Sequence, residues 1–154
     1  MTPMAKLTGE PLHILLVEDN EDHAELVIRS MRNQQVANRI HHVVDGEKAL
    51  DYLFNRGAYA DPEKNPRPNL VLLDLRLPRV DGLEVLKTIK ETPELLRIPV
   101  VILTSSDAES DVARSYDYHA NSYVVKPLEF KKFTELMKDL GFYWLGWNSQ
   151  PISD

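Results

Sequence analysis

The sequence contains no cysteine. Disulfide bonds and thiolate-bound metal sites are therefore excluded, and no residue pattern points to an oxidising compartment. Long apolar runs are absent too, because no stretch approaches the roughly 20 apolar residues that a membrane-spanning helix requires. The amino-terminal segment places charge and proline before only a short apolar run, which is a poor pattern for a signal peptide. These absences predict a cytoplasmic protein that does not associate with membranes.

Positively charged residues are fewer than negatively charged ones. The chain has 18 lysine and arginine residues against 24 aspartate and glutamate residues, a formal net charge of −6 at pH 7. Since phosphate contacts require clustered Lys and Arg, this balance argues against nucleic acid as a partner. The rest of the composition, 43% hydrophobic and 27% charged over 154 residues, is ordinary for one globular domain with a substantial core.

Apolar runs with the character of strands alternate with segments of helical periodicity. The predicted strands cover residues 12–18, 39–45, 69–74, 98–104 and 121–126. The segments "EDHAELVIRSMRNQ", "GLEVLKTIKE" and "EFKKFTELMKDL" repeat apolar residues at helical spacing; in the first, Ala24, Val27, Ile28 and Met31 fall on one face. Such alternation predicts βαβ units, and hence an α/β domain whose parallel sheet is covered by helices on both faces.

The two ends of the chain and one connection differ from this pattern. We expect residues 1–10 to form a flexible arm, residues 11–141 the folded domain and residues 142–154 an aromatic carboxyl-terminal tail. The connection over residues 55–69 carries several prolines, so it cannot continue the preceding helix and is predicted to be an extended loop. His41 and His42 are neighbours in a predicted strand and face opposite ways, so we do not expect these two to share a metal.

Polar residues close several of the apolar strands. They are Glu18 and Asp19 after the first strand, Asp74 at the end of the third, Thr104 at the end of the fourth and Lys126 at the end of the fifth. In an open parallel sheet the carboxyl ends of the strands meet at one edge, where ligands bind. Three carboxylates gathered at that edge repel one another unless a cation enters, and oxygen ligands of this kind suit Mg²⁺.

The same residues have the chemistry for phosphoryl transfer. A metal ion, the Thr104 hydroxyl and the Lys126 ammonium group can each stabilise one oxygen of a phosphoryl group. One carboxylate would then be the nucleophile and form an aspartyl phosphate; Asp74 is the best candidate because it closes the predicted central strand. Taken singly, each residue also has a structural explanation as a helix cap, a turn residue or a strand exit. Their combination favours the phosphoryl site.

Four short motifs carry these residues. "LLVEDN" contains the paired acids, "LVLLDLRLPRVDG" the central aspartate with a downstream Pro and Asp-Gly, "VVILTSS" the hydroxyl, and "SYVVKP" an aromatic residue and the lysine. Together, from about residue 12 to residue 140, they closely resemble the receiver domain of two-component response regulators. The resemblance implies a flavodoxin-like, doubly wound sheet of five parallel strands in the order 2-1-3-4-5, with five helices.

The resemblance also implies a role for each matching residue. Those that would bind Mg²⁺ are Glu18, Asp19, Asp74 and, through its backbone carbonyl, Arg76. Asp74 would accept a phosphoryl group from a sensor histidine kinase, Thr104 and Lys126 would contact the phosphoryl oxygens, and Tyr123 would be the switch aromatic. Such a protein is not an enzyme toward other substrates; it catalyses only its own phosphorylation and dephosphorylation.

Two further features, the loop over residues 55–69 and the segment "GFYWLGW", resemble the small stand-alone regulators of bacterial phytochrome kinases. This likeness implies a homodimer through the face formed by the fourth helix, fifth strand and fifth helix, together with the aromatic tail. The alternative for the tail is that its aromatic residues fold back over the helices and complete the core. The output of such a regulator would be a protein contact or onward phosphate transfer to a phosphotransfer protein.

Two alternatives stay open. One is an Mg²⁺-dependent phosphohydrolase with Asp74 as nucleophile, although the chain offers no cap domain and has Arg76 where a second acid would stand. The other is an interaction module that is not phosphorylated, against which the complete set of acids, threonine and lysine argues.

Overall fold

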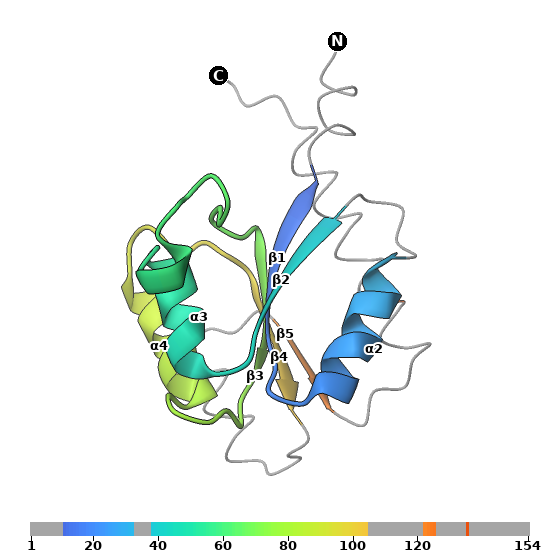
Figure 1. Ribbon diagram of the computed structural model, residues 1–154. Coiled ribbons are helices and arrows are strands. Elements are labelled where there is room, and N and C mark those ends of the chain that lie inside the picture. The colour runs from blue at the N-terminus through green and yellow to red at the C-terminus, as the bar shows by residue number, and fades with distance from the viewer. Residues whose placement is uncertain (1–10, 33–37, 105–121, 126–134, 136–154) are drawn as a thin grey trace, which may run out of the picture.

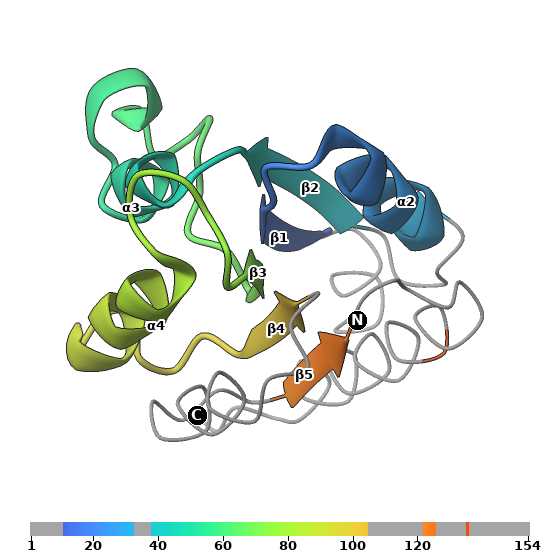
Figure 2. The ribbon, with the colours of Figure 1, turned by 90° about the horizontal axis from the view of Figure 1, so that it is seen from below.

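A computed structural model describes residues 11–32, 38–104, 122–125 and 135 of the protein. Its strands are β1 (Leu12–Val17), β2 (Asn38–Val43), β3 (Leu70–Asp74), β4 (Val100–Thr104) and β5 (Ser122–Val125). They pair in parallel, in the order β2-β1-β3-β4-β5. Figure 2 looks along the sheet from below and shows the strands side by side. The parallel α/β architecture is the one that the alternation of strands and helices predicts.

Two predicted strand ends have other roles in the structure. Asp45 is not in β2: its side chain accepts a hydrogen bond from the Lys48 backbone N–H and caps the next helix. Ile98 is not in β4, because its N–H donates to the Leu95 carbonyl in the turn that precedes the strand. Local hydrogen bonds thus accompany an earlier end of β2 and a later start of β4 than the apolar pattern suggests.

Helices cover both faces of the sheet within the described residues. They are α2 (Glu21–Arg32), α3 (Gly46–Leu53) and α4 (Gly82–Glu91), with a short 3₁₀ turn, η1 (Gly57–Tyr59). Figure 1 shows α3 and α4 on one face and α2 on the other. The apolar face predicted for α2 is confirmed: Ala24, Val27 and Met31 are buried and Ile28 is partly buried. The predicted helix over "EFKKFTELMKDL" lies almost wholly outside the described residues.

The sheet separates two hydrophobic cores. Alternate side chains of β1 and β3 enter the core under α3 and α4, among them Leu15, Val17, Val71 and Leu73. Their neighbours along the strands enter the core under α2. All five residues of β3 are buried, as expected for the central strand of a parallel sheet covered on both faces. Because fully burying one such leucine contributes about 1.5–3 kcal/mol, β3 is anchored firmly up to Asp74.

The connection over residues 55–69 is held by specific hydrogen bonds. Asn55 lies in the left-handed region with φ 52°, and its side-chain amide donates to the carbonyls of Tyr59 and Asn65. The Tyr52 hydroxyl donates to the Pro66 carbonyl at 2.9 Å, and burial raises the pKa of Tyr52 to about 12. The segment expected to be an extended loop is therefore fixed against α3.

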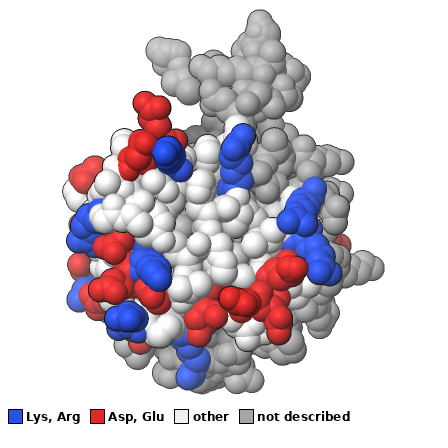
Figure 3. Space-filling model, in the orientation of Figure 1, with Lys and Arg blue, Asp and Glu red and all other residues white. Residues whose placement is uncertain are grey.

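The surface in Figure 3 carries acidic and basic side chains intermixed around an area that carries neither. This face shows no broad group of basic side chains of the kind that binds nucleic acid. Within the part of the chain that the structure describes, we find no helix that is long and apolar enough to cross a membrane.

Candidate functional site

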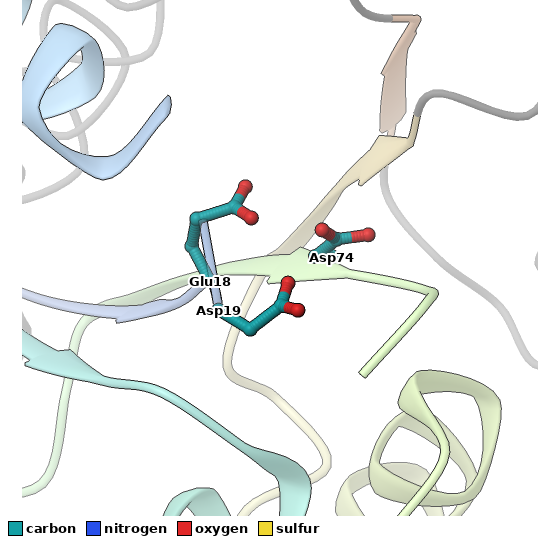
Figure 4. A group of neighbouring side chains, drawn as sticks. All are labelled: Glu18, Asp19 and Asp74. Atoms are coloured by element: carbon teal, nitrogen blue, oxygen red, sulfur yellow. The ribbon is translucent and has the colours of Figure 1, made fainter. Parts of the chain in front are cut away.

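Three carboxylates converge at the carboxyl edge of the sheet. One ligand oxygen from each of Glu18, Asp19 and Asp74 lies within 4.8 Å of the others, and Figure 4 shows the three side chains turned toward one another. Glu18 is 0% exposed and Asp74 is 5% exposed, whereas Asp19 is open to solvent. The structure thus brings together the three acids that the sequence analysis places at one edge of the sheet.

Strand register brings the acids together. Val17 of β1 pairs with Leu73 of β3, so the residues that follow each of them, Glu18 and Asp74, leave the sheet at the same level. The chain passes through α2, β2, α3 and η1 between these two residues, but β1 and β3 are neighbours in the sheet. The site thus lies at the end of the two central strands, where parallel α/β sheets bind their ligands.

Backbone hydrogen bonds hold the Glu18 segment in place. The Glu18 N–H donates to the Val43 carbonyl at 3.1 Å, which continues the β1–β2 ladder by one residue. The Glu18 carbonyl is 2.7 Å from Nε2 of His42, which donates a hydrogen bond to it. Oε2 of Glu18 accepts from the Asn20 N–H at 3.1 Å. Asn20 also caps α2, since its side chain accepts from the His23 N–H.

The segment after β3 is ordered by Asp74 and by the start of α4. Oδ1 of Asp74 accepts from the Arg76 N–H at 2.9 Å. At the far end, Asp81 caps α4 by accepting from the Leu83 N–H, and the Gly82 N–H donates to the Leu75 carbonyl. A Cβ on Gly82 would lie 2.3 Å from the Asp74 carbonyl oxygen. Only a glycine therefore lets α4 begin against the end of β3.

A cavity of about 440 Å³ opens beside the acids. It is lined by Asp19, Asp81, Leu83 and the segment from Leu75 to Pro78. Solvent reaches the cluster at Asp19, which is exposed. Glu18 and Asp74 are buried. The space is large enough for a small group bound next to the acids.

The acid cluster fits a hard divalent cation. Carboxylates at this spacing repel one another, two of them are buried, and all donor atoms are oxygens. Mg²⁺ and Mn²⁺ prefer carboxylate, carbonyl and water oxygens. The residues present would therefore hold such an ion.

The other residues expected at the site are placed only in part. Thr104 is the last residue of β4, one beyond Leu103, which pairs with Asp74, so its backbone lies at the same edge of the sheet. Tyr123 lies within β5, where it pairs with Ile102. The side chains of both residues, and the whole of Lys126, lie outside the described residues.

Comparison with known proteins identifies the family. The model of the response regulator receiver domain matches residues 14–138. The chain belongs to the response regulator receiver family. It is similar to "Probable methanogenesis regulatory protein FilR2" of Methanothrix harundinacea, with 46% identity over 92% of this chain and 89% of that protein. It is also similar to response regulator Rcp1 of Synechocystis sp., with 40% identity over 92% of this chain and 95% of Rcp1.

Solved receiver structures agree with the fold. The Mn²⁺-bound form of Rcp1 superposes with a TM-score of 0.77 at 41% identity, covering 88% of this chain and 95% of that one. The phosphorylated cyanobacterial phytochrome response regulator RcpA gives a TM-score of 0.79 at 39% identity, covering 92% and 99%. The receiver fold is thus a flavodoxin-like α/β fold, and a related receiver holds a divalent metal.

His42 is a positioning residue that the sequence did not reveal. Its contact with the Glu18 carbonyl joins residues 24 positions apart, and no local motif marks it. Replacing His42 with Leu removes one hydrogen bond to the backbone that carries Glu18 in the acid cluster. A net hydrogen bond contributes about 1 kcal/mol, so we expect the affinity for Mn²⁺, measured by calorimetry, to fall about fivefold.

The matched control is His42→Gln, whose side-chain amide can still donate to the Glu18 carbonyl and should retain most of the affinity. Equal Mn²⁺ affinities for the folded Leu variant and the parent would show that this contact does not position the acids.

Proposed function

We propose that this receiver accepts a phosphoryl group on Asp74 from a sensor histidine kinase and signals as a stand-alone response regulator. The observation that supports the proposal is the convergence of Asp74 with Glu18 and Asp19 beside an open cavity. Asp19 lines this cavity and has a carboxylate oxygen within 4.8 Å of one on Asp74, so a phosphoryl donor that enters the cavity would come close to Asp74, while the neighbouring acids would supply metal ligands.

Each residue then has a defined part in the transfer. Glu18, Asp19 and Asp74, with the backbone carbonyl of Arg76, would hold Mg²⁺. The bound ion supplies positive charge that offsets the charge on the phosphoryl oxygens. A carboxylate oxygen of Asp74 attacks phosphorus, a P–O bond forms, and the P–N bond to the histidine of the kinase breaks. The imidazole leaves with the electron pair and takes up a proton.

The remaining site residues act on the transferred group and on the output. Thr104 and Lys126 would each contact one phosphoryl oxygen and stabilise it, Thr104 by a hydrogen bond and Lys126 by its positive charge. Tyr123 would change position when Thr104 engages the phosphoryl group, which passes the signal to the face of β5. That face, with the aromatic segment over residues 142–154, would form a homodimer or contact a downstream phosphotransfer protein.

The kinase partner is proposed to be of the phytochrome class. The likeness to Rcp1 and to the phytochrome response regulator RcpA supports this choice, whereas the likeness to FilR2 favours a kinase with another stimulus. The test is phosphotransfer from a purified, autophosphorylated phytochrome kinase, with a histidine kinase of unrelated input as control. We expect rapid transfer from the phytochrome kinase and slow transfer from the control.

Transfer from neither kinase, with the receiver folded and able to bind Mg²⁺, would contradict the proposed partner class. The phosphohydrolase alternative predicts a different result, which is continuous turnover of a generic phosphomonoester. We expect no such turnover, because Asp74 would hold the phosphoryl group as an intermediate of signalling.

A further inference from the structure

Two histidines meet on the α3 side of the sheet, at the opposite end of β1 from the acid cluster. His13 is the second residue of β1, and His41 on β2 is level with Leu15, so both imidazoles lie on the same face. Nδ1 of His13 and Nε2 of His41 are 3.4 Å apart. Both side chains are half-buried, so solvent reaches the pair.

Neighbouring residues restrict the His41 ring and the backbone of His13. The His41 ring packs against the ring of Tyr52, with centroids 5.3 Å apart, and Tyr52 packs in turn against Tyr59 at 5.4 Å. The backbone of His13 is tied to Asn69 by two hydrogen bonds, of 2.9 and 2.7 Å. Side chains held this way lose little freedom when they bind a ligand, which is a requirement of an effective metal site.

Both imidazoles are suited to act as neutral ligands. Burial, followed by the charge of Arg39, lowers the pKa of His13. Burial lowers the pKa of His41 as well, with smaller effects from His13 and Arg39. A neutral imidazole is the form that binds metal. Arg39 also opposes a bound cation, but its side chain is exposed, so water screens its charge.

The distance between the nitrogens indicates which kind of ion fits. At 3.4 Å the two nitrogens lie at the long end of the hydrogen-bond range, so an N–H···N bond between them is weak; the two rings are nearly parallel, with an interplanar angle of 23° and centroids 5.6 Å apart. Two nitrogens that each lie about 2.0–2.1 Å from a tetrahedral Zn²⁺ are about 3.3–3.4 Å apart, which matches the observed separation. Neighbouring ligands of an octahedral ion at the same bond length would be closer, at about 2.8–3.0 Å.

We propose that Nδ1 of His13 and Nε2 of His41 form a second metal site, which takes a tetrahedral, imidazole-preferring divalent cation of the Zn²⁺ class. Among the residues that the structure describes, no set of three metal-ligating side chains includes this pair. Water therefore completes the coordination, and the ion exchanges with solvent. Such an ion would join β1 to β2 and differ in chemistry from the hard cation of the acid cluster.

The test is calorimetric titration of the full chain with Zn²⁺ in excess Mg²⁺, which occupies the acid cluster. We expect one Zn²⁺ per chain, and an affinity at least about tenfold lower in His13→Gln and in His41→Gln. His23→Gln, which changes a histidine of α2 across the sheet, should bind like the parent. Unchanged affinity in both variants of the pair, or binding lost on Asp74→Asn, would overturn the proposal.

A measurement on the parent protein covers the case in which the variants do not fold. In two-dimensional NMR spectra of the imidazole groups, Zn²⁺ should shift the resonances of His13 and His41 before those of His23. The same site should give Co²⁺ the intense visible absorption of a tetrahedral complex. Resonances of His13 and His41 that stay in place when one equivalent of Zn²⁺ is bound would refute the site.

Discussion

Replacing Asp74 with Asn is expected to raise the free energy of unfolding in the absence of divalent metal, by on the order of 2 kcal/mol. Asp74 shares a space with Glu18 and Asp19, with ligand oxygens within 4.8 Å of one another, and two of the three side chains are buried. Two unit charges at that distance repel by about 3 kcal/mol at an effective dielectric constant of about 20, and solvent at exposed Asp19 reduces the total. The Asn side chain can still accept from the Arg76 N–H.

The same substitution should nearly abolish stabilisation by Mg²⁺. An ion that binds only the folded state raises stability in proportion to the logarithm of its concentration over Kd, so a weakened site loses this gain. Urea denaturation with and without Mg²⁺ measures both effects. Asp81→Asn is the matched control: it makes the same chemical change at an exposed helix cap, where Asn caps as well as Asp, and should stay within about 0.5 kcal/mol of the parent.

The account of the acid cluster would be wrong if metal-free Asp74→Asn were less stable than the parent. It would also be wrong if the variant and the parent gained equally from Mg²⁺.

Gly82→Ala is expected to destabilise the protein by about 3 kcal/mol and to weaken metal binding at the same time. A Cβ at this position would lie 2.3 Å from the Asp74 carbonyl oxygen and 2.6 Å from the Leu75 Cα. Both obstacles are backbone atoms, so the clash is relieved only by moving α4 away from β3. That movement would shift the backbone next to Asp74, a member of the acid cluster that is proposed to bind the metal.

Gly57→Ala is the control for the Gly82 prediction. A Cβ on Gly57 would meet nothing within 4 Å, although its φ of +56° lies in the left-handed region, so we expect a cost of only about 1 kcal/mol. Urea denaturation and Mn²⁺ titration of both variants test the difference. If Gly82→Ala cost no more than Gly57→Ala, the contact between Gly82 and the end of β3 would not be tight.

Residue patterns predicted the parts of this structure that depend on periodicity and strand order. The apolar run that ends at Asp74 marks a central strand, and the carboxyl ends of neighbouring parallel strands must meet, so the approach of Glu18 and Asp19 to Asp74 could be expected. The buried face of α2 follows in the same way from the spacing of Ala24, Val27 and Met31.

Contacts between side chains distant in sequence could not be predicted. Neighbouring strand residues point to opposite faces, so His41 and His42 were expected to have separate surroundings, as they do. Nothing in the pattern, however, says that His42 reaches the Glu18 carbonyl or that His41 meets His13. These contacts depend on the exact register of β1 and β2 and on the packing of α3, which a single sequence does not specify.

The hydrogen bonds that hold the connection over residues 55–69 could not be predicted for a related reason. Its prolines exclude a helix but say nothing about which polar groups pair. In the structure, Asn55 in a left-handed conformation supplies two side-chain hydrogen bonds and the Tyr52 hydroxyl a third, which together fix the segment.

The central claim is that Asp74 is the phosphoryl acceptor, and its most direct test is the intact mass of the chain after incubation with acetyl phosphate. We expect the parent to gain one labile phosphoryl group in the presence of Mg²⁺ and none after chelation of the metal. Asp74→Ala should gain none under either condition. A folded, metal-binding parent that gains no phosphoryl group, or an Asp74→Ala variant that gains one as the parent does, would contradict the account.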